Sequence, residues 1–364
     1  MSSPRQPRQI LVICTRRIGD VLLATPAVRA LREGDPGAAI DMLVFEGTQG
    51  VVAANPDLRD VITIPERPSI GAQLRLLWRI WRRYDVAVSL LAGDRPTLYA
   101  WASGKQRVGT LTLESKSRWK RRLLHRWVVF DDLDTHTVAM NLRVVEQLGA
   151  HRHSGPVVKW SEDDAGVAVK ACEPLRSGRP FAVLHVSPKY AYKTWSAPGW
   201  GELARWLRGR GLEPVITGGG SVEELRYIDS LLPQFPDSTV NIAGKIGLGA
   251  LGYLLSRADL YVGTDTAVTH MAAALGVPTV ALFGPSSPVK WGPWPASFEG
   301  KASPWKMRGS AHAGNVFLVQ GEKNCVPCLL EGCDRHTGSL SECLQQLPAA
   351  RVIAAAEELL ETKR

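Results

Sequence analysis

The chain has 364 residues and a formal net charge of +9, and 45% of its residues are apolar while 22% are charged. This composition excludes a disordered chain, and the length exceeds what one hydrophobic core usually supports, so we expect two domains. No apolar run approaches the roughly 18 residues that a membrane-spanning helix needs, which excludes a helical integral membrane protein.

The excess positive charge lies in the first part of the chain. Residues 1–160 hold 24 basic and 15 acidic side chains, whereas residues 161–364 hold 20 of each. This asymmetry predicts two parts with different partners. Few apolar residues precede Arg16 and Arg17, so we expect no signal peptide and a cytoplasmic protein. In that compartment the six cysteines are expected to be reduced thiols or metal ligands.

Strands and helices alternate along the first half. Short apolar runs predict strands at 10–14, 41–45, 61–65 and 85–91, with a helical pattern after the first of them. A second helix carries an apolar stripe beside a row of arginines. The stripe consists of Leu74, Leu77, Trp78 and Trp81, and the row consists of Arg75, Arg79, Arg82 and Arg83. We expect a buried stripe under a solvated basic face.

A second alternation follows a polar stretch at about 155–179. We predict strands at 181–187, 213–217, 239–243, 259–263 and 279–283, and helices at 200–207, 222–232, 253–258, 267–275 and 349–360. The pattern indicates α/β architecture with two doubly wound parallel sheets. The predicted parts are an N-terminal domain at 1–160, a linker at 161–179, a C-terminal domain at 180–345 and a final helix at 346–364. Such sheets bind ligands at the carboxyl ends of their strands, so two of them facing each other imply a cleft.

Two motif matches point away from the functions that they suggest. Residues 247–252 fit G-x-G-x-x-G, but they lie deep in the second half and precede only a short helix, unlike a dinucleotide fingerprint. The basic, Trp-containing run at 115–127 is accompanied by no zinc-finger, helix-turn-helix or RNA-binding pattern. We therefore expect no nucleic-acid partner.

Three features carry candidate chemistry. Asp20 stands in a turn between strand and helix, where a carboxylate is an ordinary helix cap and could also act on a ligand. Residues 262–270 end a strand and start a helix, whose free amides could bind a phosphate beside Thr264 and Thr266. A merely well-capped helix is the alternative. Lys193, in the loop after another strand of that half, could neutralise the same phosphate or be simply solvated.

Three segments together resemble glycosyltransferase family 9, the heptosyltransferases of lipopolysaccharide core assembly. They are ILVICTRRIGDVLLATPAVRALR, HVSPKYAYKTWSAPGWGELA and DLYVGTDTAVTHMAAALGVPTVALFGPSSP, in family order and over most of the chain. Arg16 before Gly19-Asp20, the sequence Gly93-Asp94-Arg95, and HTVAMNLRVVEQLG most resemble the heptosyltransferase III type, which adds a branching heptose.

The resemblance implies a GT-B fold, with two Rossmann-like domains facing across a cleft. It further implies inverting, metal-independent transfer of heptose from ADP-L-glycero-D-manno-heptose to an inner-core sugar of lipopolysaccharide. Asp20 matches the general base, and Lys193 matches the lysine that balances charge on the departing ADP. The remaining donor-binding positions are Ser187, Glu223, the Lys245-Ile246 backbone, Asp265, and the amides of Thr266 and Ala267, with Glu223 open to more than one register.

The basic half is expected to face the acceptor and the anionic inner leaflet, peripherally at the inner face of the cytoplasmic membrane. The acceptor-binding candidates are Arg16, Arg17, Asp94, Arg95, Arg121 and Arg122. The alternatives are a transferase that uses another nucleotide sugar on a different glycan or protein acceptor, and a non-catalytic nucleotide- or nucleic-acid-binding protein. Asp20 and Lys193 together argue against the latter.

A loop at 325–343 is rich in cysteine. Its four cysteines are Cys325, Cys328, Cys333 and Cys343, and they begin with the C-x2-C spacing of a metal knuckle. The later spacings are irregular for zinc, although some members of the resembled family bind iron in such a loop. The sequence leaves a structural zinc or iron and a set of free thiols as alternatives.

Overall fold

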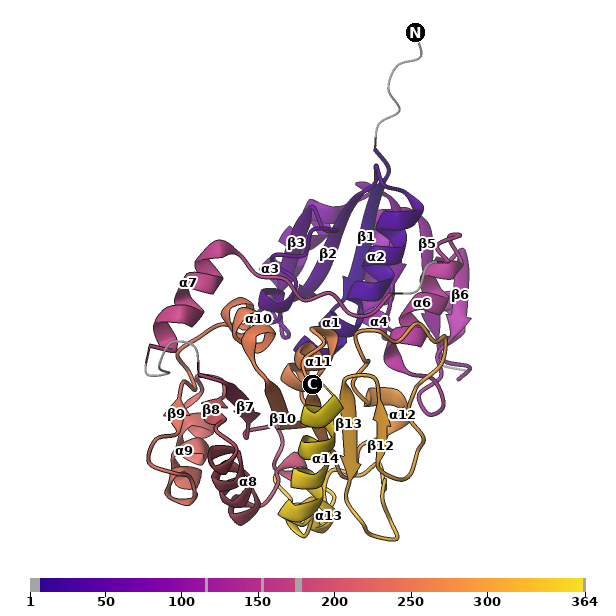
Figure 1. Cartoon of the computed structure of the whole chain (residues 1–364). Helices are drawn as coiled ribbons and strands as arrows, with labels where there is room; N and C mark the ends of the chain where they lie inside the picture. The colour runs from indigo at the N-terminus through magenta and orange to yellow at the C-terminus, as the bar shows by residue number, and fades with distance from the viewer. Residues whose placement is uncertain (1–6, 115–116, 152–153, 174–178, 363–364) are drawn as a thin grey trace. The chain divides into compact units, whose positions relative to one another are not determined.

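The computed structural model describes residues 7–114, 117–151, 154–173 and 179–362. The chain forms two compact units (Figure 1), of which unit 1 comprises Met1–Val157 with Glu299–Ala302 and unit 2 comprises Val158–Phe298 with Ser303–Arg364. Each unit is built on a largely parallel β-sheet covered by helices. The α/β class predicted from the alternating pattern is thereby confirmed.

Unit 1 contains a six-stranded parallel sheet with the strand order β3-β2-β1-β4-β5-β6. Its strands are β1 (Gln9–Cys14), β2 (Ala39–Phe45), β3 (Asp60–Ile64), β4 (Tyr84–Ser89), β5 (Gly104–Leu111) and β6 (Arg126–Val129). The central strand β1 is almost entirely buried, as its continuous apolar run predicts for a strand covered on both faces. The strand order reverses between β1 and β4, which is where such sheets bind ligands.

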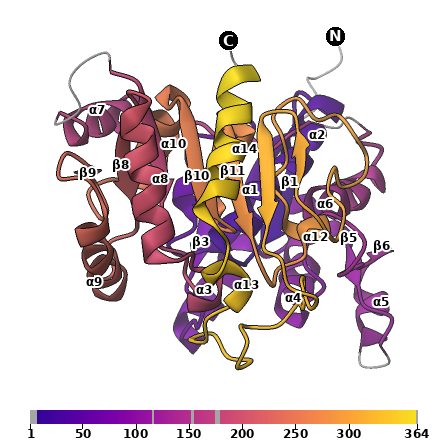
Figure 2. The same cartoon turned by 60° about the horizontal axis from the view of Figure 1, so that its bottom comes forward.

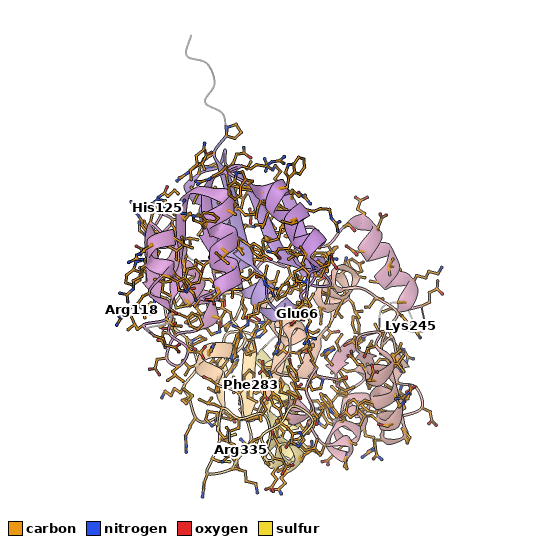
Figure 3. The ribbon with its side chains drawn as sticks, turned by 180° about the vertical axis from the view of Figure 1, so that it is seen from behind. Glu66, Arg118, His125, Lys245, Phe283 and Arg335 are labelled. Carbon is orange, nitrogen blue, oxygen red and sulfur yellow. The ribbon has the colours of Figure 1, made fainter. Side chains whose placement is uncertain are left out.

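Helices cover both faces of this sheet. Helices α1 (Ile18–Leu23) and α2 (Thr25–Gly34) pack beside α6 (Thr137–Glu146). Helices α3 (Ile70–Ile80) and α4 (Asp94–Ser103) pack beside each other and share a core with β1 to β4. The short helix α5 (Lys120–Leu123) connects β5 to β6, and Figure 3 shows its flanking residues Arg118 and His125 at the outer edge of unit 1.

The expectation that the apolar stripe of α3 is buried is wrong for three of its four members, and only Leu77 is half-buried against the core. The exposed fraction of Trp78 is 78%, that of Leu74 is 61% and that of Trp81 is 50%. The buried positions of the helix are instead Leu76 and Ile80, which face the core shared with α4. Two apolar rows therefore run along α3, and only one of them fits under the helix.

Unit 2 contains a seven-stranded sheet with the order β12-β13-β11-β10-β7-β8-β9, in which only β12 is antiparallel to its neighbour. Its strands are β7 (Phe181–His185), β8 (Glu213–Thr217), β9 (Val240–Asn241), β10 (Leu260–Thr264), β11 (Thr279–Phe283), β12 (Ala311–Ala313) and β13 (Val316–Gln320). Figure 3 shows Phe283, at the end of β11, within this unit.

The helices of unit 2 also form two layers. Helices α8 (Ala197–Gly209), α9 (Val222–Leu231) and α14 (Ala349–Thr362) share a core with the sheet, and Figure 2 shows α8 and α14 side by side on it. Helices α10 (Leu248–Arg257) and α11 (Ala267–Ala274) pack against each other. Short helices complete the unit: η3 (Ala191–Lys193), η4 (Leu232–Gln234), α12 (Pro288–Trp291) and α13 (Glu342–Gln345).

The stretch at 161–179, which was predicted as a linker, contains a helix of unit 2. The division between the units falls at Val157, and helix α7 (Glu162–Ala171) lies within residues 161–179. Its N-terminus is closed by a capping box between Ser161 and Asp164, and it packs on α10 of the same unit. A Cβ on Gly249 of α10 would clash with the carboxylate of Asp164, so glycine permits this close packing. Residues 174–178 lie outside the described residues.

Candidate active site

The donor-binding candidates of unit 2 follow neighbouring parallel strands. Ser187 follows β7 and Asp265 follows β10, while Ser286, which was not among the candidates, follows β11. Because these strands are parallel and adjacent, their carboxyl ends meet at one edge of the sheet. The structure therefore brings together residues that lie far apart in the sequence.

Lys193 and Asp265 form an ion pair at this edge. Nζ of Lys193 lies 2.5 Å from Oδ2 of Asp265, and 8% of the Asp265 side chain is exposed. Burial by itself raises the pKa of the Asp265 carboxyl, but the cationic Lys193 and a hydrogen bond from Ser286 help to hold that pKa below its ordinary value. The edge thus carries a fixed carboxylate beside an ammonium group that retains partial solvent access.

The N-terminus of α11 lies directly after Asp265. Thr266 is its N-cap and accepts a hydrogen bond from the amide of Thr269, so the capping alternative holds for this side chain. Ala267 is the first residue of the helix, and the helix dipole favours an anion at this end. Nearby, Oγ1 of Thr264 and Nδ1 of His270 are buried and have no hydrogen-bond partner among the described residues. Such unsatisfied buried atoms are typical of sites that are completed by a ligand.

Sequence reasoning missed two members of this cluster. Burial lowers the pKa of His270 to about 4, and the side chain interacts electrostatically with Asp265 and Lys193. Its signal was an isolated histidine in an otherwise apolar helix, one turn after the N-cap. Ser286 could have been found because it follows the strand adjacent to that of Asp265.

The loop after β8 gives a different result for the predicted glutamate. Glu223 is exposed on α9, whereas its neighbour Glu224 turns back and accepts a 2.7 Å hydrogen bond from the amide of Gly219. Lys245 (Figure 3) is exposed in the turn after β9. Its Nζ donates a hydrogen bond to the carbonyl of Asn241. Its neighbour Ile246 is half-buried. Donor binding by the backbone of residues 245–246 stays a prediction. In the glycine loop after β8, the structure identifies Glu224 as the residue whose side chain fixes the backbone.

In unit 1, Asp20 lies in the first turn of α1 and is buried, but it is not the N-cap, which is Arg17. Its Oδ1 lies 3.6 Å from Nε of Arg16, which is half-exposed. Arg17 is exposed as well. A carboxylate is therefore held at the carboxyl end of β1, the central strand, next to a cation that reaches solvent.

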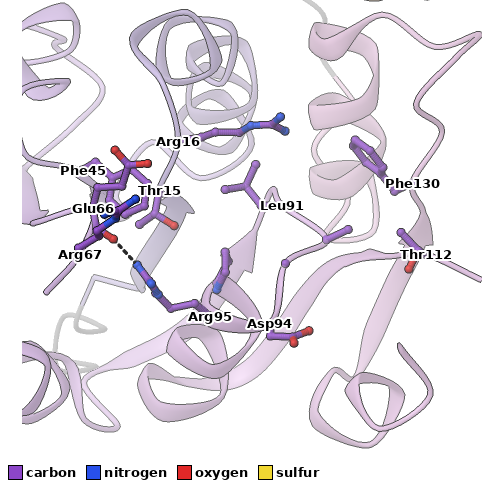
Figure 4. Close-up of a pocket in the computed structure, with 13 residues that line it drawn as sticks. Thr15, Arg16, Phe45, Glu66, Arg67, Leu91, Asp94, Arg95, Thr112 and Phe130 are labelled. Carbon is purple, nitrogen blue, oxygen red and sulfur yellow. Dashed lines mark hydrogen bonds between the residues drawn. The ribbon is translucent and has the colours of Figure 1, made fainter. Parts of the chain in front are cut away.

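Arg16 also lines a pocket of about 680 Å³ in unit 1 (Figure 4). Both acceptor candidates at the start of α4, Asp94 and Arg95, line it too, whereas Arg17 does not. The other lining residues come from the carboxyl ends of β1 to β6 and the loops after them: Thr15, Phe45, Glu66, Arg67, Leu91, Ala92, Gly93, Pro96, Thr112 and Phe130. Arg95 donates a 2.8 Å hydrogen bond to the carbonyl of Glu66, which ties two sides of the rim together.

Lys120 of α5 is buried against the loop after β4, which lines this pocket. Nζ of Lys120 donates to the carbonyl of Ala92 and lies 2.7 Å from Oδ1 of Asp94. Only 5% of the Lys120 side chain is exposed. The sequence showed Lys120 as one of several surface cations, and its burial against a pocket-lining loop could not be foreseen.

The rest of the basic run differs from Lys120. Arg121 and Arg122 are exposed on α5, and the guanidinium of Arg121 lies 5.2 Å from the ring centroid of Trp127. Neither residue lines the pocket. Residues 115 and 116 of the run lie outside the described residues.

Three cysteines of the loop at 325–343 lie close enough to Cys343 to act on its thiol electrostatically. Burial, reinforced by Cys328, Cys325 and Cys333, raises the pKa of the Cys343 thiol to about 11. Within the described part of the chain, no group of three or more His, Cys, Asp or Glu side chains is arranged to hold a metal ion. A metal at these cysteines therefore stays a prediction. Over the same residues, no helix is both long and apolar enough to cross a bilayer.

Comparison with known proteins gives a consistent result. The model of glycosyltransferase family 9 (heptosyltransferase) matches residues 99–307, more than half of the chain. Lipopolysaccharide heptosyltransferase 3 of Escherichia coli K12 is 27% identical over 352 residues, which cover 94% of this chain and 95% of that protein.

Solved structures share the fold. A family 9 glycosyltransferase from Veillonella parvula superimposes with a TM-score of 0.78 at 22% identity, covering 98% of this chain and 97% of that one. E. coli ADP-heptose lipopolysaccharide heptosyltransferase II gives a TM-score of 0.74 at 21% identity, covering 98% and 99%. The predicted GT-B fold class is confirmed by these similarities and by the two parallel sheets.

Proposed function

Because the chain belongs to glycosyltransferase family 9, we propose that it transfers heptose from ADP-L-glycero-D-manno-heptose to an inner-core sugar of lipopolysaccharide. The observation that carries this proposal is the Lys193–Asp265 pair at the N-terminus of α11. It supplies a cation and helix amides for a diphosphate, and a carboxylate for sugar hydroxyls. The names of the relatives refer to lipopolysaccharide and ADP-heptose, which agree with that chemistry.

The donor side of the reaction follows from unit 2. The glycosidic bond breaks between the anomeric carbon and the phosphate oxygen, and ADP leaves with the electron pair. Lys193 and the first amides of α11 stabilise the negative charge that develops on the leaving diphosphate. Because this charge is met by protein groups, the proposal requires no catalytic metal. Asp265 would fix the donor sugar by accepting hydrogen bonds from its hydroxyls.

The acceptor side follows from unit 1. Asp20 takes the proton of the acceptor hydroxyl as its oxygen forms the new bond to the anomeric carbon. A single displacement of this kind inverts the configuration at that carbon. The pocket beside Arg16 offers Arg67 and Arg95, whose guanidinium groups suit the carboxylates and phosphates of an inner core. A branching heptose, as in the heptosyltransferase III type, is the product that we propose.

The deciding experiment measures ADP release from ADP-heptose with a panel of truncated lipopolysaccharide acceptors. The proposal predicts release that depends on one acceptor structure and a product with one added heptose. Equal or faster release from another nucleotide sugar would replace the donor assignment. Binding of nucleotide without any transfer to the whole panel would favour the non-catalytic alternative.

A structural zinc or iron at Cys325, Cys328, Cys333 and Cys343 is a separate proposal. It is supported by the C-x2-C spacing and by the electrostatic effect of the other three cysteines on the thiol of Cys343. Metal analysis of the purified protein tests it, with Cys172→Ser as the matched control for Cys328→Ser. A protein without stoichiometric metal, or one whose metal content survives Cys328→Ser, would leave free thiols as the correct interpretation.

A further inference from the structure

A continuous exposed apolar surface runs along α3 and α4, and we call it the α3–α4 surface. Its members are Ile70, Leu74, Trp78 and Trp81 from α3 and its C-cap, and Leu98 and Trp101 from α4. Their exposed fractions are 81%, 61%, 78% and 50% in the first group and 43% and 37% in the second. Exposed apolar surfaces of this extent mark interaction sites in soluble proteins.

The two helices form one surface and not two separate patches. Residues 70, 74, 78 and 81 recur at helical spacing, so they share one side of α3. The rings of Trp81 and Trp101 meet edge to face, with centroids 5.8 Å apart, and this contact joins the α3 row to α4. Both indoles also keep part of their surface exposed to solvent.

A row of arginines accompanies the apolar row. Arg75, Arg79, Arg82 and Arg83 are all exposed, and Arg75 and Arg79 each stand one residue after an apolar member of the surface. Within the described residues only Arg79 of these four forms an ion pair, with Asp60. The guanidinium groups of Arg82 and Arg83 each lie 5.9 Å from a ring centroid, those of Trp81 and Trp78. Two of the four guanidinium groups thus lie beside the exposed indole rings of the surface.

The surface begins at the pocket of unit 1. The pocket-lining Arg67 precedes Ile70 by three residues, and the pocket-lining Asp94 starts the helix that carries Leu98 and Trp101. Both helices therefore start near the pocket, and Trp81 and Trp101 lie towards their far ends.

We propose that the α3–α4 surface docks unit 1 onto an anionic lipid surface, with the indoles in the headgroup layer and the arginines on lipid phosphates. Trp and Leu next to Arg is the composition of helices that lie in a membrane interface. A second copy of this chain fits poorly, because a symmetric contact would oppose the four arginines to one another. The inference deepens the proposed function and rests on it only for the acceptor being embedded in that membrane.

Vesicle sedimentation with the full chain tests this directly. The probes are vesicles of phosphatidylcholine alone and of phosphatidylcholine with phosphatidylglycerol. Wild type is expected to bind the anionic vesicles. The affinity of the double variant Leu74→Ser/Trp78→Ser for them is expected to be lower by about tenfold or more. Val222→Ser, which removes a 63% exposed side chain from α9 of unit 2, is the matched control and is expected to bind like wild type. Arg82→Gln/Arg83→Gln is expected to reduce both the affinity for anionic vesicles and its salt dependence.

The outcomes separate docking from catalysis. Because the substituted side chains are exposed, the double variant is expected to keep the wild-type melting temperature and its rate on a delipidated acceptor. It should lose rate only on the acceptor embedded in vesicles. Wild-type vesicle binding by this folded variant would overturn the proposal. A difference in molar mass between the variant and the wild type, measured by light scattering, would also overturn it, because it would indicate that the surface mediates self-association. Vesicle binding that follows the pattern in a protein without heptose transfer would keep the docking surface and refute the proposed function.

Discussion

Replacing Lys193 by methionine isolates the contribution of the ion pair in unit 2. Methionine keeps most of the volume of the side chain and removes its charge. Asp265 is 8% exposed and would keep its negative charge in a largely dry place without a cation. Removing one partner of a buried pair costs about 3 kcal/mol at the lower end of the usual range, which fits a lysine that is itself 19% exposed.

That free energy corresponds to a fall of about 6 to 12 °C in the melting temperature of a unit of this size. The effect must depend on pH. In the wild type the pKa of Asp265 is lowered, so its stabilisation is present above the ordinary carboxyl pKa and is lost as the pH falls through the folded-state pKa. Without Lys193, burial raises that pKa, so the gap between variant and wild type is widest near pH 7 and narrows towards about pH 4.

Differential scanning calorimetry at pH 7 and at lower pH measures this, with the transition of unit 2 followed separately. Lys189→Met removes an exposed lysine from the same loop and is expected to change stability by less than about 0.5 kcal/mol. Lys193→Met/Asp265→Asn should recover part of the loss, because no buried charge is then left alone. A wild-type melting temperature for Lys193→Met at pH 7, or a loss that is equal at every pH, would refute the reasoning.

Three further outcomes follow from single sites. Asp20→Asn is expected to lower turnover at least about 100-fold while ADP-heptose still binds, as measured by ADP release and calorimetry, and near-normal turnover would remove the base assignment. Lys120→Met removes the hydrogen bond to the carbonyl of the pocket-lining Ala92. This change should lower the melting temperature of unit 1 and raise the acceptor KM more than Asp94→Asn does. Equal effects of the two variants would argue against a positioning role of Lys120. Burial lowers the pKa of His185 to about 4, so this side chain is expected to cost up to about 3 kcal/mol of stability as the pH falls from about 6.5 to 4. Burial also lowers the pKa of His270 to about 4, so His185→Asn should make that part of the urea-midpoint profile shallower while the contribution of His270 remains.

The sequence was sufficient for features that depend on local periodicity. The predicted strands at 213–217 and 279–283 match β8 and β11 residue for residue, because short buried runs bounded by polar turns have few alternative structures. Strands β5 and β6 were missed, since Gly, Lys, Gln and Arg in their sequences obscure any alternation. Sequence reasoning placed Lys193 near the start of the helix after Asp265, because residues after adjacent parallel strands share an edge, but the direct ion pair between the two side chains came only from the structure.

Only the tertiary structure decided which of two apolar rows on α3 is buried, and that Lys120 lies under a pocket-lining loop. Both rows of α3 satisfy a helical period, and the choice depends on the space left beside α4, which no local pattern encodes. Likewise, a lysine in a basic run carries no mark of burial until a distant carbonyl and carboxylate are placed beside it. The amino-acid sequence thus determined the fold class and the sheet edge at which Lys193 and Asp265 lie. Tertiary packing determined which cations and indoles stay exposed to solvent, because exposure depends on which neighbouring elements cover each side chain.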